Sequence, residues 1–524
     1  MRQLRGHQVV ELVALLTSDA LAARSEAGVV SGGPGTAGGD EGGAEGDSAR
    51  RRHRRSVRIR TLMEELGPFY VKLGQMLSTR PDIATTALTA ELGCLHQAVS
   101  PTPFAQFVPV LDQELGRDWR RELRDVDDVS PLGSASLAQV YRATRADGTP
   151  VVIKIQRPGA RSRVLADMAA LRRAARVVGR SFPKLDMVFD TDATLAVLYD
   201  AMQPELDFRV EAQNMEYARR AAADFDLISV PGVVRATPRV LVQSLAPGHS
   251  IGSAQAASLP VELRRAAGSQ LLAFMYRGYF TDRFFHADPH PGNVLVDRDH
   301  GATLIDWGMV GRLDRNLSGL GMLTLTSLAQ NDARGLVSAW VGMGRATGWA
   351  DLPGFQEDMS RLVPRLAAAS LDNLNFGVAL ATILRQSARR GIRSSPMIGL
   401  LGKSFANVEG SVRLIAPELS IVQVFREALT DVMVELAREM VSVEQAARTA
   451  LDGMAGGTIA LDQVRSILRD VSGREGTMRV GLLPGHGIGG EGDNPLRQYW
   501  PHLAVASAAL WFLRKEARQR AWHR

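Results

Sequence analysis

The chain has 524 residues, 45% of them hydrophobic and 23% charged, which is the balance of folded domains with a water-exposed surface. This length suits two or more ordinary domains, or one large two-lobed domain with extensions. The single cysteine, Cys94, excludes a disulfide framework and is expected to be a small buried residue. The net charge of +6 is modest, so we interpret it as an arginine-rich surface and expect no nucleic acid partner.

The N-terminal part is predicted to contain a helix and a linker. Residues 1–26 are predicted to form an amphipathic helix, because Glu11 interrupts the apolar run that a signal peptide would need. Residues 27–55 are predicted to be a disordered linker, glycine-rich at first and arginine-rich from residue 50. The arginine run is either a solvated helix start or a segment attracted to anionic lipid. No stretch reaches the roughly 20 apolar residues that span a bilayer.

Residues 56–125 are predicted to form a helical extension. Within them Leu62, Leu66, Phe69 and Leu73 recur every three or four residues, which is the period of an amphipathic helix. This extension is expected to pack its apolar face against the domain that follows.

Residues 126–250 are predicted to form a small lobe built around a hairpin. A loop of small residues, 130–136, precedes two predicted strands at 137–144 and 151–155, which a turn at Asp147-Gly148 joins. In this loop Gly133, Ser134, Ala135 and Ser136 stand where a protein kinase carries three glycines. Side chains here restrict the approach of the backbone to phosphate, so an ordinary protein kinase is not expected.

Lys154 lies in the middle of the second predicted strand. A lysine among buried apolar residues is costly unless an acidic group pairs with it. The candidates are Glu205, Asp207 and Glu211, and the four-residue step from Asp207 would put Glu211 on the same face of a helix within 160–220. We therefore expect a paired lysine, as in the phosphate-binding sites of kinases.

Residues 251–472 are predicted to form a larger, mostly helical lobe whose chemistry lies between 286 and 308. Asp288 and Asn293 have the spacing D-x-x-x-x-N, and Asp306 follows a predicted strand thirteen residues later. Asp288 would orient or deprotonate an acceptor, while the Asn293 and Asp306 oxygens suit Mg²⁺. His286 lies four residues from His290, but the intervening prolines oppose a helical metal site, so His286 is expected to be structural.

The C-terminal part is predicted to consist of a flexible linker, 473–496, and a helix, 497–524. The helix contains an uncharged run at 503–513 that is too short to span a membrane, and arginines follow it. It is either an interfacial, membrane-associated helix or a packed terminal helix.

Several motifs resemble those of the UbiB/AarF family of atypical kinases, whose eukaryotic members support ubiquinone synthesis. The most specific is Lys72-Leu-Gly74-Gln75, which is similar to the K-x-G-Q signature that precedes the family's kinase core. Glu205-Leu-Asp207 is similar to the E-x-D element, and Glu211 to the helix glutamate. The loop 133–136 is similar to the alanine-rich loop.

The resemblance implies an α+β, two-lobed protein-kinase-like fold with an N-terminal helical extension and a predominantly helical C-terminal part. It also implies that Lys72 meets Glu205 and Asp207, so that the helix of Gly74 and Gln75 covers the cleft. The expected cofactors are ATP and Mg²⁺, and the expected activity is that of an ATPase or small-molecule kinase. An anionic lipid, an isoprenoid quinone precursor and a second copy of the chain are expected partners of a cytoplasmic protein at the membrane periphery.

Two other functions are weighed against this one. Aminoglycoside and choline kinases share H-x-D-x-x-x-x-N and Ile-Asp-Trp with this chain, but they lack the K-x-G-Q and E-x-D elements. A non-catalytic nucleotide-binding scaffold is the third reading. Against it, the chain retains all of the residues that phosphoryl transfer requires, namely Lys154, Asp288, Asn293 and Asp306.

Overall fold

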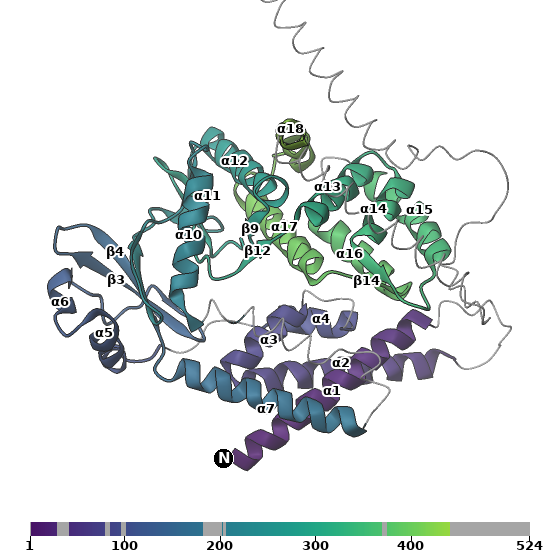
Figure 1. Cartoon of the computed structure of the whole chain (residues 1–524), viewed down its shortest axis with the longest axis horizontal. Helices are drawn as coiled ribbons and strands as arrows, with labels where there is room; N and C mark the ends of the chain where they lie inside the picture. The colour runs from purple at the N-terminus through teal and green to yellow at the C-terminus, as the bar shows by residue number, and fades with distance from the viewer. Residues whose placement is uncertain are drawn as a thin grey trace, which may run out of the picture. The chain divides into compact units, whose positions relative to one another are not determined.

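The computed structural model describes residues 2–28, 41–78, 84–95, 101–181, 202, 206–368 and 375–440. The chain divides into two compact units, Met1–Arg426 and Glu427–Arg524, and the account below concerns the first. This unit has a strand-rich small lobe, a mostly helical larger lobe and a set of N-terminal helices (Figure 1). The α+β, two-lobed kinase-like fold predicted from the sequence is therefore confirmed.

The small lobe is a curled antiparallel sheet in the order β1-β3-β4-β7-β6, with β2 paired to β3. The predicted hairpin is present; β3 alternates in part between buried and less buried side chains, whereas β4 is buried except at Pro150 and Lys154. On one face of the sheet Tyr141, Ile153 and Ile155 pack against α5 (Val108–Leu115) and a short helix after it. Since side chains alternate across a strand, Lys154 lies on the other face. The strands are β1 (Leu123–Arg124), β2 (Gly133–Ser134), β3 (Ala138–Arg145), β4 (Pro150–Gln156), β6 (Val233–Ala236) and β7 (Val240–Ser244).

Residues 104–123 belong to the small lobe and not to the extension in which the sequence placed them. Phe104 and Phe107 make edge-on contacts with Tyr141 of β3, and Trp119 lies within the same apolar cluster. The helices concerned are η2 (Phe104–Gln106), α5 and α6 (Trp119–Glu122). The predicted extension of 56–125 was too long because helical periodicity alone does not say which surface a helix covers.

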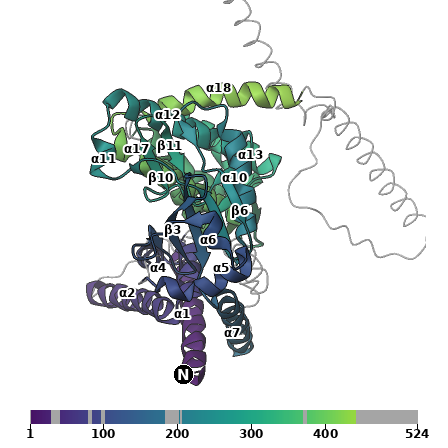
Figure 2. The same cartoon turned by 90° about the vertical axis from the view of Figure 1, so that its left-hand side faces the viewer.

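The N-terminal extension is formed by α1 (Arg2–Gly28), α2 (Glu41–Leu66), α3 (Pro68–Ser78) and α4 (Thr86–Gly93). Helix α1 packs against α2 and against α7 (Ala160–Ser181), and α2 packs against α4. Figures 1 and 2 show these helices gathered below the two lobes. Their shared apolar cluster contains Leu12, Leu62, Leu66, Phe69 and Leu73, so the predicted amphipathic face is buried as expected.

The prediction of a disordered linker over 27–55 is wrong from residue 41 onward, because α2 begins at Glu41. Arginine is a good helix former, and the basic run gains support from the helices around it. Arg55 donates to the Ser18 carbonyl, and Arg58, just beyond the run, pairs with Glu11 at 2.9 Å. Cys94 is also not buried as expected: it is exposed at the C-terminal cap of α4.

Among the described residues, the larger lobe combines three small sheets, of which β13-β14 is one, with a set of helices. One sheet has the order β5-β11-β10-β8, and β9 pairs with β12. Strands β10 (Val294–Asp297) and β11 (Gly301–Leu304) carry the predicted site residues at their ends. The remaining elements are β5 (Ile228–Ser229), β8 (His249–Ser250), β9 (Phe284–His286), β12 (Val310–Arg312), β13 (Gly344–Ala346), β14 (Ile392–Ser394), α10 (Phe208–Ala222), α11 (Ala254–Ala257), α12 (Val261–Phe280), α13 (Arg315–Ala329), α14 (Ala333–Gly342), α15 (Leu352–Ala368), α16 (Phe376–Arg389), α17 (Pro396–Ile415) and α18 (Ile421–Met440).

Helices α16 and α17 pack closely because Gly377 has no side chain. A Cβ atom at Gly377 would overlap the backbone of Ala406. The buried Glu409 of α17 accepts a hydrogen bond from the Phe376 backbone N–H at 3.1 Å, at the start of α16. Burial raises the pKa of Glu409 to about 8.

The predicted linker at 473–496 and C-terminal helix at 497–524 lie outside the described residues. Among the helices that the structure describes, none combines the length and apolar character needed to cross a membrane.

Candidate nucleotide and metal site

Lys154 joins three elements at the centre of the site. Its Nζ lies 2.8 and 2.9 Å from the two Glu211 oxygens and 3.0 Å from Asp306 Oδ1. The Glu211 side chain is 2% exposed, that of Lys154 15% and that of Asp306 48%. A buried carboxylate needs such a cation, since an unpaired charge there would cost several kcal/mol (about 3–5). The paired lysine expected from the sequence is present, and Glu211 is its helix partner.

Glu211 reaches Lys154 because it lies in the first turn of α10. This helix begins at Asp207, whose extended backbone (φ −148°, ψ 99°) and side chain form the N-terminal cap. The expectation that Asp207 and Glu211 share one face of a helix is therefore wrong: Asp207 precedes the helix and its carboxylate pairs with Arg209 at 2.6 Å. An Asx residue competes with the backbone for hydrogen bonds and so favours such a cap over the helix interior.

Asp306 follows β11 in a left-handed backbone conformation, with φ +59°. This region is unfavourable for a residue with a Cβ atom and is often found at functional sites. The Lys154 ammonium holds the pKa of the Asp306 carboxyl well below its usual range, and the Lys72 ammonium acts in the same direction. Asp306 is therefore ionised at neutral pH.

His286 is a structural histidine, as expected. It is buried, its Nδ1 accepts the Asp288 backbone N–H at 3.1 Å, and its Nε2 lies 3.0 Å from the Ile305 carbonyl. The first bond makes Nδ1 the acceptor, so Nε2 carries the proton and donates. Burial lowers the pKa of the imidazole, which keeps it neutral. His286 thus fixes the Asp288 backbone relative to the residue that precedes Asp306.

Trp307 fills the space behind this loop. It is buried, and its ring stacks on Phe284 at 6.0 Å and lies edge-on to His286 at 4.7 Å. Its indole N–H donates to the Leu304 carbonyl, so the polar atom is satisfied. Trp307 therefore contributes packing behind the loop.

The Asp288 carboxylate is held by two side chains of α17 that the sequence reasoning missed. Asn407 Nδ2 donates to Asp288 Oδ1 at 2.6 Å, and Lys403 Nζ lies 3.2 Å from Oδ2. From the same helix Ser404 donates to the His286 carbonyl and Ser411 to the Pro289 carbonyl. Ser404, Asn407 and Ser411 recur at spacings of three and four with Lys403 beside them, but α17 also carries Glu409 and Arg413, so this spacing alone does not single them out.

Asn293 and Asp306 offer oxygens that fit a divalent cation. Asn293 Nδ2 donates to the Asp288 carbonyl at 3.1 Å, which leaves the amide oxygen as the open atom. Within the described residues, neither this oxygen nor Asp306 Oδ2 has a hydrogen-bond partner. The same part of the chain contains no group of three His, Cys, Asp or Glu side chains that would hold a metal alone. A Mg²⁺ ion here would complete its octahedron with phosphate oxygens and water.

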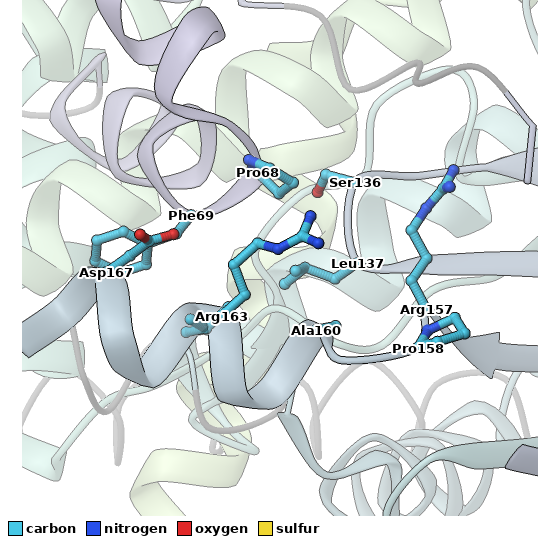
Figure 3. Close-up of a pocket in the computed structure, with 10 residues that line it drawn as sticks. Pro68, Phe69, Ser136, Leu137, Arg157, Pro158, Ala160, Arg163 and Asp167 are labelled. Carbon is cyan, nitrogen blue, oxygen red and sulfur yellow. The ribbon is translucent and has the colours of Figure 1, made fainter. Parts of the chain in front are cut away.

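Arg157, at the end of β4, fixes the loop 133–136. Its guanidinium donates to Ser134 Oγ at 2.8 Å and to the Ala135 carbonyl at 2.9 Å, and it also contacts Thr102. Behind the loop Ser136 and Leu137 meet the start of α3 across a pocket of about 20 Å³, which is room for one water molecule (Figure 3). The loop is therefore held by Arg157 from within the small lobe and is flanked by the start of α3; the role of Arg157 was not predicted.

The helix α3 carries the K-x-G-Q residues next to this site. A Cβ atom at Gly74 would overlap the side chains of Leu95 and Met63, so the glycine permits close packing on α2 and the end of α4. Gln75 Nε2 lies 3.4 Å from the Leu95 carbonyl, and Lys72 acts electrostatically on Asp306. The expected contact between Lys72 and Asp207 is not formed, since Asp207 pairs with Arg209. Glu205 lies outside the described residues.

The fold is that of a protein-kinase-like protein. The arrangement of the lysine, the glutamate and the residues expected to form the catalytic loop and to bind metal agrees with this class. The family described as the ABC1 atypical kinase-like domain matches residues 94–340. A Clostridium pasteurianum protein described as "Uncharacterized protein in hydrogenase 1 5'region" is 29% identical over 368 residues, 70% of this chain and 69% of that protein. The "Probable protein kinase UbiB" of Shewanella baltica strain OS155 is 27% identical over 391 residues, 72% and 70% of the two chains.

The chain belongs to the UbiB/AarF family of atypical protein-kinase-like proteins. A solved Mycobacterium tuberculosis protein, Rv3197 in complex with erythromycin, has the same fold with a TM-score of 0.50. It is 22% identical, and the match covers 74% of this chain and 98% of that one. At this identity the likeness concerns the fold alone.

Proposed function

We propose that the protein is an atypical kinase or ATPase that binds Mg-ATP and supports the synthesis of isoprenoid quinones or related lipids at the membrane. The observation that carries the first part is Lys154, which bridges the buried Glu211 and the ionised Asp306. The Lys154 ammonium lies between these two carboxylates, at the position where the phosphates of ATP and their metal ion would bind. The lipid part rests on the family, with the S. baltica relative named UbiB.

Each site residue then has a role in phosphoryl transfer. Lys154 would bind the α- and β-phosphates, and loop 133–136 would cover them. Asn293 and Asp306 would hold Mg²⁺, which would neutralise part of the phosphate charge. Asp288 would accept the proton of the attacking hydroxyl or water while the bond between the γ-phosphorus and the leaving ADP oxygen breaks. The occluding role proposed for Lys72, Gly74, Gln75, Glu205 and Asp207 rests on the family resemblance.

Nucleotide binding can be tested with Asp306→Asn, which removes a charge without changing shape. We expect wild-type protein to gain thermal stability with Mg-ADP, and the variant to lose the part of that gain that depends on Mg²⁺. Asp299→Asn is a matched control, because Asp299 is exposed in the turn between β10 and β11. The absence of any shift with ATP or ADP in the wild-type protein would refute the enzymatic function.

The lipid part of the proposal has its own test. A strain that lacks the protein should lose an isoprenoid quinone or a related lipid. Wild-type protein should restore it, and Asp288→Asn should not. ATP turnover should also rise with vesicles that contain anionic lipid. Unchanged lipid profiles and equal turnover with and without vesicles would remove the membrane function while leaving nucleotide binding intact.

A further inference from the structure

A second pocket lies between the N-terminal extension and the larger lobe, where α4, α16 and α17 meet. It encloses about 380 Å³, which is in the range of small-molecule sites. Its walls are mainly small and apolar side chains of α16 and α17, completed by the end of α3 and by α4.

Lys403 lies between this pocket and residues 286–293, the expected catalytic loop. One face of α17 lines the pocket with Ile398, Gly402 and Ala406. The adjacent face, with Ser404 and Asn407, binds the catalytic loop. Lys403 lies at the border of these two faces, since it lines the pocket and its Nζ is 3.2 Å from Asp288 Oδ2. A ligand head group that reached Lys403 would therefore approach the carboxylate that we expect to accept a proton.

The polar groups of the pocket indicate the chemistry of its ligand. Arg385 and Lys403 both line it, and none of its lining residues is acidic. The hydroxyl-bearing residues Ser78 and Thr86 also line the pocket. The pocket thus combines apolar walls with cationic and hydroxyl groups, which suits an amphiphile with one oxygen-bearing head.

We propose that this pocket binds the phosphoryl acceptor, and that the acceptor is an alcohol or phenol with an apolar body. This inference rests on the proposed function for the catalytic role and names the substrate class of that site. The acceptor hydroxyl contacts Lys403 and gives its proton to Asp288 as its oxygen bonds to the γ-phosphorus and the ADP oxygen leaves. Asn407 acts through Asp288 as a positioning residue.

A bulky side chain at Gly402 tests the pocket with little effect on the fold. A Cβ atom at this buried position meets only Leu380 Cβ, at an ordinary 3.6 Å, so Gly402→Leu should fill the pocket without displacing α17. Gly410→Leu is the matched control: Gly410 is exposed on the same helix and a Cβ atom there meets nothing within 4 Å. Both changes also remove a helix glycine, so their effects on helix propensity are equal.

The experiment measures binding of 1-octanol and octyl phosphate to the full chain by calorimetry, with Mg-ADP as the reference ligand. We expect Gly402→Leu to weaken both amphiphiles about tenfold or more, and Gly410→Leu to leave them unchanged, while Mg-ADP binds all three proteins alike. Equal amphiphile affinity in Gly402→Leu and wild type would overturn the inference. If Gly402→Leu does not fold, Ala381→Leu on the opposite wall provides the same test.

A change at Lys403 tests the position of the head group. Lys403→Met should weaken octyl phosphate about tenfold and Lys403→Arg should retain most of the affinity, because the phosphate needs a cation at this point. Phosphorus NMR should detect octyl phosphate formed from ATP and 1-octanol by wild type and not by Gly402→Leu. Equal octyl phosphate binding by Lys403→Met and wild type would refute the proposed orientation. Failure of Mg-ADP binding in every protein would instead refute the proposed function and not the pocket.

Discussion

The site contains two lysine–carboxylate clusters, and they differ in the parts of the fold that they connect. Lys154 connects β4 of the small lobe with α10 and with Asp306 of the larger lobe. Lys403 and Asn407 hold Asp288 entirely within the larger lobe. The first cluster therefore links the two lobes and stabilises buried charge, whereas the second positions one carboxylate beside a pocket.

The two clusters also differ in burial. The Glu211 side chain is 2% exposed, while that of Lys403 is 24% exposed. The penalty for an unpaired charge grows with burial, so the loss of each lysine should have different consequences. Loss of Lys154 should affect folding and nucleotide binding together. Loss of the α17 contacts should affect turnover with little effect on stability.

The largest effect is expected from Lys154→Met. The change leaves Glu211 buried without its cation and should lower the free energy of unfolding by about 3–5 kcal/mol. Chemical denaturation of the full chain measures this. Arg145→Met provides the control, because Arg145 forms an exposed ion pair with Asp147 at 2.8 Å and its loss should change the free energy of unfolding little. Similar losses for the two variants would contradict the linking role of Lys154.

The parts of the fold that were predictable from sequence depend on short-range patterns. The hairpin of β3 and β4, and the positions of Lys154 and of Asp306 after a strand, follow from alternation and turn residues. Asp207 and Glu211 were expected on one helix face, but Asp207 caps α10 instead, as an aspartate favours the N-cap over the helix interior. The family motifs assigned residues that lie far apart in the sequence to one site, which helix and strand patterns alone could not do.

The contacts that the sequence did not predict join distant segments. Asn407 meets Asp288 across 119 residues, and Arg157 meets Thr102 across 55. Neither pairing can be identified from the sequence around these residues, because each depends on how α17 or loop 133–136 lies in the fold. The roles of the site residues stay predictions, although the structure brings Lys154, Glu211 and Asp306 together and places Asn293 beside Asp288.

A third carboxylate, Glu409, sharpens the comparison because it forms no ion pair within the described residues and accepts the backbone N–H groups of Phe376 and Gly377 instead. Burial raises its pKa from 4.5 to about 8, the opposite direction to Asp306 beside Lys154. The folded protein then keeps a proton that the unfolded chain releases between pH 4.5 and 8, so the stability from this group falls as the pH rises through that range. Glu409→Gln should remove this dependence and gain about 1–3 kcal/mol relative to wild type between pH 5 and 9. Parallel pH profiles of melting temperature for the two proteins would contradict this.

We expect Asn407→Leu to have the smallest effect on stability and the most specific effect on turnover. The change removes the 2.6 Å hydrogen bond to Asp288 Oδ1 and leaves the Lys403 contact in place. A carboxylate that can rotate is a poorer proton acceptor, so turnover of ATP should fall about tenfold to a hundredfold while the Kd for Mg-ADP stays unchanged.

Ser411→Ala is the matched control for Asn407→Leu. It removes a 2.8 Å hydrogen bond from the same helix to the same loop, but the acceptor is the Pro289 carbonyl and not the Asp288 carboxylate. Both variants should lose about 1 kcal/mol of stability, since each breaks one hydrogen bond. Only Asn407→Leu should lose turnover. Equal turnover in the two variants would mean that α17 serves only to hold the loop, because the loop is the one feature that both hydrogen bonds share.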